Sequence, residues 1–220
     1  MMMKKISLTA FCLVLSLMLI YVNVVFAEEL KSIQLPKPQL DGGKLLMQAL
    51  KDRKSSRDFS PEKLPLQVLS NLLWAASGVN RPELGKRTAP TAANWQEIDI
   101  YVANAEGLYL YDAKPHVLKT VLAGDIRALT GRQPFVKEAA LNLIYVADFS
   151  RKGRGTNEEK DFFSAADTGF IAQNVYLFCA SEGLATVVRA SIDKPTLAKA
   201  MKLGPDQRIT LSQTVGYPKK

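Results

Sequence analysis

The apolar run from Ala140 to Ala147 places the strongest constraint on how this chain can fold. Apart from Asn142, every residue in it is aliphatic or aromatic, and charged residues flank it at Glu138 and Asp148. A strand with this pattern is buried on both faces rather than on one. The run therefore predicts the central strand of a sheet that other elements cover.

Residues 162–181 carry the longest helical pattern in the chain. Small residues such as Ala165, Gly169 and Ala172 share a wide face of this helix, which permits close packing against a second helix. Gly183 follows at a position typical of a helix C-terminus. We therefore expect one long helix that ends at this glycine.

The remaining pattern predicts a single α+β domain over residues 44–220, preceded by an extended leader at residues 28–43. Further helices are expected at residues 45–56, 64–77, 116–129 and 193–203. Further strands are expected at residues 98–102, 108–111, 185–188 and 209–215, the first two as a hairpin. Because a hairpin and helical crossovers occur together, we expect a mixed central sheet of about four to five strands flanked by helices.

The N-terminus has the layout of a secretory signal peptide at residues 1–27. Lys4 and Lys5 precede an apolar run, and Ala27 supplies a small residue at a cleavage position. We expect cleavage after Ala27 and export, to the periplasm. The alternative is an uncleaved membrane anchor formed by residues 6–26, since this run approaches the length that spans a bilayer.

Charge and residue usage restrict the ligand. The formal net charge is +8, and it falls to +6 if cleavage removes Lys4 and Lys5, because no acidic residue leaves with them. His116 and Cys179 would then be the one histidine and the one cysteine, so we predict no Cys/His metal site. No long basic run interleaved with aromatic residues occurs, so we predict no nucleic-acid partner. A small anionic ligand is the simpler reason for the positive charge.

The stretch from Arg53 to Phe59 reads RKSSRDF and is the strongest candidate for an anion site. Planar guanidinium groups and hydroxyls at this density suit a phosphate. The stretch follows a helix C-terminus, whose partial negative charge repels anions, so the cations must come from Arg53 and Arg57. Neither a P-loop nor a dinucleotide fingerprint occurs in the chain. Taken alone, however, the stretch is more typical of a solvated basic turn.

Four stretches, in this order and at these separations, resemble the nitroreductase family of flavin enzymes. They are R-x-S-x-R-x-F at residues 53–59, PTAANWQ at 90–96, DTGFIAQN at 167–174 with GLAT at 183–186, and VGYP at 215–218. The resemblance covers residues 45–218 and looks closest to the dehydrogenase branch that oxidises rings during peptide-toxin maturation. It implies a nitroreductase-like α+β fold that binds FMN without covalent attachment, at the interface of an intertwined homodimer.

Carried over by position, the resemblance implies that Arg53 and Ser55 hold the FMN phosphate. Arg57 would approach the N1/O2 edge of the flavin, where negative charge develops on reduction. The loop residues that would wall the flavin or hydrogen-bond to it are Pro90, Thr91, Ala92 and Asn94.

The resemblance also implies backbone N–H groups near flavin N5 and O4, where a donor favours the reduced ring. Here they would come from Val188, Arg189 and Ala190, while Lys219 and Lys220 would add phosphate contacts. Arg189 stands where family members often carry a small or acidic residue. We hypothesise that its side chain, if it lies over the flavin, favours an anionic substrate or hinders a nicotinamide. No catalytic side chain is implied.

These expectations combine into an exported FMN-dependent oxidoreductase that moves two electrons, as hydride, between flavin N5 and a small organic substrate. Its electron donor stays open, because an exported enzyme would not meet the cytoplasmic NAD(P)H pool. Two alternatives are a flavin-binding protein without turnover and a periplasmic protein that binds another anionic ligand.

Overall fold

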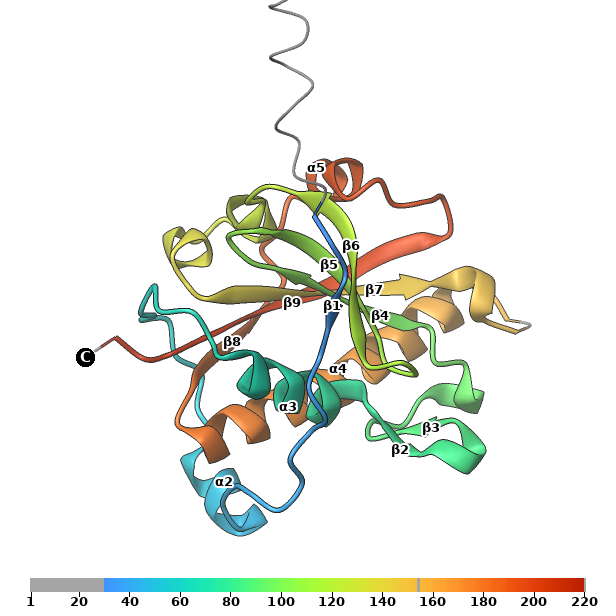
Figure 1. Cartoon of the computed structure of the whole chain (residues 1–220). Coiled ribbons are helices and arrows are strands. Elements are labelled where there is room, and N and C mark those ends of the chain that lie inside the picture. Colours follow the sequence, from blue (N-terminus) through green and yellow to red (C-terminus); the bar gives the residue numbers. More distant parts are fainter. Residues whose placement is uncertain (1–29, 154, 220) are drawn as a thin grey trace, which may run out of the picture. The chain divides into compact units, whose positions relative to one another are not determined.

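The computed structural model describes residues 30–153 and 155–219 of the 220-residue chain. From Lys31 onward these residues belong to one compact unit, which Figure 1 shows. The expected signal peptide at residues 1–27, the alternative anchor at residues 6–26 and the candidate Lys220 lie outside the described residues. Within the described ranges, no helix is long and apolar enough to cross a membrane.

A seven-stranded sheet forms the middle of this unit, with the order β1-β6-β5-β4-β7-β9-β8. Its strands are β1 (Ile33–Gln34), β4 (Ile98–Ala103), β5 (Gly107–Asp112), β6 (Val117–Ala123), β7 (Leu141–Asp148), β8 (Ala185–Arg189) and β9 (Gln207–Gly216). Every pairing within it is antiparallel. The α+β class is confirmed, whereas the expected mixed sheet of about four to five strands was wrong in strand number and in direction.

Two local features explain the additional strands. The helix expected at residues 116–129 is instead β6, because the β-branched Val117, Thr120 and Val121 suit a strand that pairs with β5. His116 turns the chain into this strand at a φ of 55°, and its ring contacts Ser70 Oγ at 2.7 Å. The leader adds β1, which pairs with β6.

The long helix explains the strand directions. Helix α4 (Asn157–Glu182) connects β7 with the edge strand β8, and β9 lies between these two strands. β9 pairs antiparallel with both of them, so β7 and β8 run the same way without being neighbours. The helical crossover therefore produces no parallel pair.

Strand β7 occupies the centre of the sheet, as its apolar run predicts. It pairs with β4 and β9, and residues 141–147 are buried. Ile144 packs with Leu197 on one face of the sheet. On the other face, Tyr145 Oη donates to Gln213 Oε1 at 2.6 Å, and the Gln213 amide donates to the α4 backbone at Ala172. The strand is thus covered on both faces.

The helix predicted at residues 162–181 is α4, which begins five residues earlier, at Asn157. Thr156 and Glu159 form a capping box at its start, and Gly183 ends it with a φ of 71°. Helices α2 (Leu46–Asp52) and α3 (Leu66–Ser77) pack against α4, which itself lies on β4, β8 and β9 (Figure 1). Helix α5 (Lys194–Ala200), the last α-helix in the described part of the chain, contacts β9.

Short elements connect these parts. A separate hairpin of β2 (Val79–Arg81) and β3 (Lys86–Arg87) follows α3. The 3-10 turns are η1 (Pro82–Leu84), η2 (Ala92–Asn94), η3 (Arg127–Thr130), η4 (Pro134–Lys137) and η5 (Phe149–Arg151).

Candidate functional site

The stretch from Arg53 to Phe59 runs beside the free edge of β8 and the end of β9. Ser56 N–H donates to Thr186 O at 2.9 Å, along the edge of β8 that β9 does not pair. Lys219 N–H donates to Asp58 O at 3.2 Å, so the chain after β9 lies beside the same stretch. The stretch, β8 and the C-terminal segment therefore meet at one place.

Phe59 anchors this stretch in the core. Its side chain is 4% exposed, and its ring centroid lies 5.4 Å from that of Phe135. Its backbone bridges to Pro218. A Cβ at Gly216 would lie 3.4 Å from the Phe59 ring and 3.2 Å from the Ala140 nitrogen, so the absence of a side chain permits this approach. The first and last of the four stretches are thus in direct contact.

Tyr176 of α4 links the stretch to β8. Its hydroxyl lies 2.8 Å from Ser55 Oγ and accepts the Val188 N–H at 3.0 Å. The Arg53 guanidinium carbon lies 5.4 Å from the centre of its ring, within range of a cation–π contact. Sequence reasoning missed Tyr176, because it reads as one more packing residue of the long helix.

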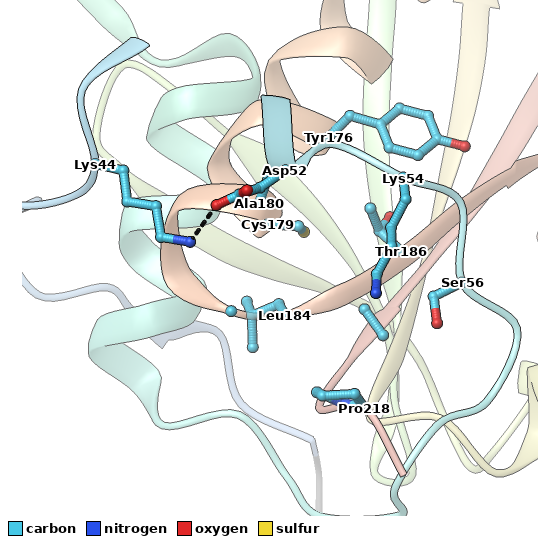
Figure 2. A pocket seen from close by; sticks show the side chains of 12 residues that line it. Lys44, Asp52, Lys54, Ser56, Tyr176, Cys179, Ala180, Leu184, Thr186 and Pro218 are labelled. Carbon is cyan, nitrogen blue, oxygen red and sulfur yellow. Dashed lines mark hydrogen bonds and ion pairs between the residues drawn. The ribbon is translucent and has the colours of Figure 1, made fainter. Parts of the chain in front are cut away.

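The side chains of the stretch alternate in direction, as they do in extended chains. Lys54 and Ser56 line a cavity of about 320 Å³, together with residues of α4, β8 and the C-terminal segment. Figure 2 shows the Lys54 side chain directed into this cavity beside Ser56, across from Leu184. The candidate anion ligands alternate with these two residues and are Arg53, Ser55 and Arg57.

Arg53 and Arg57 place two positive charges on this stretch. Among the residues that the structure describes, neither guanidinium forms an ion pair. Ser55 and Arg57 are exposed, Arg53 is half-buried, and the nearby Lys219 is exposed. Two such guanidinium groups and a hydroxyl on one extended segment fit an anion of the size and charge of phosphate.

The end of β8 differs from expectation in two respects. The Val188 N–H already donates to Tyr176, so it is engaged within the protein. The Arg189 side chain is 5% exposed and extends into the interior, where Nη1 donates to Thr130 O at 2.7 Å. The hypothesis that this side chain selects an anionic substrate is therefore wrong, because a substrate has no access to it. Ala190 is exposed just beyond the strand.

The loop at residues 90–96 has an unusual backbone. Ala93, Asn94 and Gln96 have φ values of 47°, 56° and 49°, in the left-handed region that residues with a Cβ rarely adopt. Gln96 N–H donates to Thr91 Oγ1 at 3.0 Å and holds the turn closed. The loop thus keeps a strained conformation through its own side-chain hydrogen bonds, and Asn94 is exposed on it while Thr91 is half-buried.

Asp167 of α4 holds this loop through a hydrogen bond to its backbone. Its Oδ2 accepts the Ala92 N–H at 3.0 Å, and the residue is 2% exposed. Burial, together with the neighbouring Glu97 carboxyl, raises the pKa of Asp167 to about 6, although Lys152 opposes the shift. Lys152 Nζ donates to Ser164 Oγ at 2.5 Å and lies 3.6 Å from Glu97 Oε1. The Ala92 N–H in the loop is therefore held by a carboxylate that belongs to a buried cluster of ionisable groups, with Lys152 and Glu97.

The candidate residues fall into two groups at different places along α4. Tyr176 contacts the group with Arg53 and Ser55, whereas Asp167 contacts the loop that carries Asn94. At a rise of 1.5 Å per residue, the two contact points are about 14 Å apart along the helix. A ligand that contacts both groups on one chain would therefore have to extend over about this distance.

Known proteins similar in sequence to this chain belong to one family. A family model described as the nitroreductase family matches residues 50–217, which include all four stretches. A Methanocaldococcus jannaschii protein described as a nitroreductase is 34% identical over 145 residues, covering 61% of this chain and 73% of that protein.

Solved structures show the same fold. A crystal structure described as a nitroreductase of Ralstonia eutropha is 44% identical and has a TM-score of 0.84, covering 88% of this chain and 92% of that one. The NADPH:FMN oxidoreductase of Vibrio harveyi, complexed with NAD+, has a TM-score of 0.60 at 18% identity, covering 80% and 69%. The Escherichia coli microcin synthetase complex has a TM-score of 0.66 at 16% identity, covering 100% and 85%; these two likenesses concern the fold alone. The match to the family model over most of the chain shows that this protein belongs to the nitroreductase family of oxidoreductases.

Proposed function

We propose that the protein is an FMN-dependent oxidoreductase whose flavin phosphate binds at Arg53 and Ser55. The observation that carries this proposal is a pair of guanidinium groups on either side of an exposed hydroxyl, with no carboxylate partner in the described part of the chain. Their segment is hydrogen-bonded to β8 and to the C-terminal segment. Lys219 would add charge to the same phosphate, and Lys220 is a further candidate. When bound, FMN would supply the two-electron chemistry, and the protein would orient it.

Arg57 has a separate proposed role. It is exposed, and it lies two residues beyond Ser55 on the same side of the extended segment. From there it would face the pyrimidine edge of the flavin, where a fixed cation stabilises the charge of the reduced ring. The backbone at Arg189 and Ala190 would approach the N5 side, whereas Val188 would act by holding Tyr176.

Replacing Arg53 and Arg57 singly by glutamine separates these roles. Arg53→Gln should raise the FMN dissociation constant about tenfold or more, because a charge-assisted contact to phosphate is lost. Arg57→Gln should also lower the reduction potential of bound FMN, since the reduced, more negative ring loses its cation. Fluorescence titration with FMN and a spectroelectrochemical titration measure the two effects. Equal potentials in both variants and the native protein would show that the division of roles is wrong.

A homodimer would bring the two groups of candidate residues together. Large apolar side chains are exposed on α2, where Met47 is 75% exposed, and on α4, where Phe162 and Phe170 are 69% and 48% exposed. The two helices pack against each other, and exposed apolar side chains on neighbouring elements favour association with another chain. In the proposed homodimer, the second copy contributes its Pro90, Thr91, Ala92 and Asn94 to the flavin site that holds the first copy's arginines.

Complementation tests the shared site. Arg53→Ala and Asn94→Ala should each weaken FMN binding in a homodimer. When the two variants are denatured together and refolded, half of the dimers mix, and about one quarter of all sites should regain native affinity. No regain of high-affinity sites, although mixed dimers form, would mean that the loop and the arginines do not share a flavin across the interface.

We further propose export, with residues 1–27 removed as a signal peptide, and a periplasmic location. Mass spectrometry of the protein from a periplasmic extract should then find a chain that begins at Glu28. Recovery of the intact N-terminus in the membrane fraction would instead support the anchor at residues 6–26. An exported enzyme would take electrons from a substrate that it oxidises, as the dehydrogenase branch would, or from another redox protein.

The visible spectrum separates the oxidoreductase from its alternatives. Yellow protein that is bleached by a reductant and reoxidised by an organic acceptor would support the enzyme. Bound flavin without turnover of any acceptor would support a flavin-binding protein. A colourless protein that takes up no added FMN would leave the binder of another anion.

A further inference from the structure

A second cationic site lies between the β2–β3 hairpin and the loop at residues 90–96. It is a cavity of about 390 Å³, a size that suits a small ligand. Three cations line it from the hairpin side, and polar loop residues line it from the other. The lining contains no acidic residue and consists of Arg81, Lys86, Arg87, Ala89, Pro90, Thr91, Ala93, Asn94 and Gln96.

The three cations have no ion-pair partner within the described ranges. Two carboxylates act on Arg87 from a distance, and each is paired with another cation, Asp99 with Arg151 at 2.5 Å and Asp112 with Lys119 at 2.6 Å. Arg81 uses Nε and Nη2 within the hairpin, on Asn80 Oδ1 and Arg87 O. Its Nη1 group and the exposed Lys86 therefore have donors to offer.

Hydrogen bonds fix the position of the Arg87 side chain in the cavity lining. Its Nε donates to Gln96 Oε1 at 2.8 Å and its Nη1 to Ser77 O at 3.1 Å. Gln96 in turn donates to Gly85 O at 3.0 Å, which ties the loop to the hairpin. Both walls are thus joined to each other, and the guanidinium keeps Nη2 without a protein acceptor in the described chain. Arg87 also lines the neighbouring cavity beside Asp99 and Asp112, so it contributes fixed positive charge here. Arg81 and Lys86 supply the donors that suit a carboxylate or phosphate.

We propose that this cavity binds the anionic group, a carboxylate or a phosphate, of the small molecule that reacts at the flavin. The link to the flavin rests on the proposed function, because the loop that lines the cavity with Asn94 is the one assigned to the flavin wall. The anion site itself depends only on Arg81, Lys86 and Arg87. These residues take the role of recognising an anionic substrate, for which the buried Arg189 is unsuited.

The test compares two acceptors of matched size, p-nitrobenzoate and the neutral p-nitrobenzamide, with the FMN-loaded full chain. The double variant Arg81→Gln/Lys86→Gln should raise KM for p-nitrobenzoate about tenfold and change KM for p-nitrobenzamide by less than about twofold, since charge-assisted contacts are lost for the anion alone. Lys114→Gln/Arg132→Gln removes two exposed cations elsewhere and should leave both values unchanged.

Calorimetric titration of the FMN-free chain with p-nitrobenzoate and with inorganic phosphate separates the two proposals. Binding that the double variant weakens supports the anion site even if no flavin binds and no turnover is found. Because inorganic phosphate should also bind at Arg53 and Ser55 in the FMN-free chain, only the binding that the double variant weakens is assigned to this cavity. If that component is tighter for phosphate, the site takes phosphate esters, and if it is tighter for p-nitrobenzoate, the site takes carboxylates. An unchanged ratio of the two KM values, or loss of FMN affinity in the double variant, would overturn the proposal, the latter because the cavity would then serve the cofactor.

Discussion

Replacing Arg189 with alanine is expected to lower the free energy of unfolding by about 3 kcal/mol, although the residue ends an edge strand. The side chain donates from Nε to Thr214 Oγ1 at 3.1 Å, from Nη1 to Thr130 O at 2.7 Å and from Nη2 to Asn142 Oδ1 at 2.9 Å. Burial lowers the pKa of Arg189 to about 10, so the guanidinium stays charged at neutral pH. These three bonds join β8 to β9, to η3 and to β7, respectively.

The cost has two origins. Truncation leaves a cavity the size of a guanidinium side chain, and it removes three charged donors from buried acceptors. Thr130 O keeps a second donor in Ser212 Oγ, and Asn142 Oδ1 keeps one in Thr214 Oγ1, which limits the loss. The effect therefore stays below that of an acceptor left wholly unpaired.

Urea denaturation measures this change. Arg132→Ala is the matched control, because Arg132 is exposed and lies in the same segment as Thr130. It should change the free energy of unfolding by less than about 0.5 kcal/mol. A loss at Arg189 no larger than that of the control would show that the buried bonds contribute nothing net.

The sequence predicts the fold best where one pattern admits one structure. The run at residues 140–147 is apolar apart from Asn142, and it contains the central strand. The helices predicted at residues 64–77 and 162–181 follow from apolar spacing and from a glycine just after each C-terminus, and the structure has them at 66–77 and 157–182. Residues 116–129 mislead because Leu118, Leu122 and Ile126 also fit a helical spacing, and pairing with β5 decides in favour of a strand.

The sequence predicts those site residues that lie together in one short motif, and it does not predict those whose partners are distant in the chain. The stretch from Arg53 to Phe59 is recognisable in the sequence as a motif. The structure places it beside β8 through the Ser56–Thr186 hydrogen bond and beside the C-terminal segment through the Lys219–Asp58 hydrogen bond. Tyr176 and Arg87 become candidates only in three dimensions, because their significance lies in hydrogen bonds to residues distant in sequence. Arg189 shows the converse, since its charge in the sequence suggested a surface role that burial rules out.

Replacing Asp167 with asparagine is expected to remove a pH dependence from the stability of the protein. Burial is the main reason that the native state raises the pKa of this carboxyl from 3.8 to about 6. Its protonated form is therefore favoured by folding, and the stability that it contributes is present below pH 3.8 and is lost as the pH rises through 6. The loss between pH 4.5 and pH 7.5 should be on the order of 2 kcal/mol.

Asparagine keeps the anchor while removing the titration. Its carbonyl can accept the Ala92 N–H as Asp167 Oδ2 does. Its amide can donate toward Glu97, whose buried Oε2 has no hydrogen-bond partner in the described part of the chain. Lys152 is the cation that faces the same cluster, and it is retained in the variant.

Denaturant unfolding at several pH values compares Asp167→Asn with the native protein. The stability of the variant relative to the native protein should increase as the pH rises from 4.5 to 7.5. Asp161→Asn provides the control, because Asp161 is exposed on the same helix and forms a surface pair with Arg208; it should cost less than about 1 kcal/mol at every pH. If the native and Asp167→Asn curves run parallel, Asp167 does not titrate in this range, and the loop at residues 90–96 rests on a permanently charged anchor.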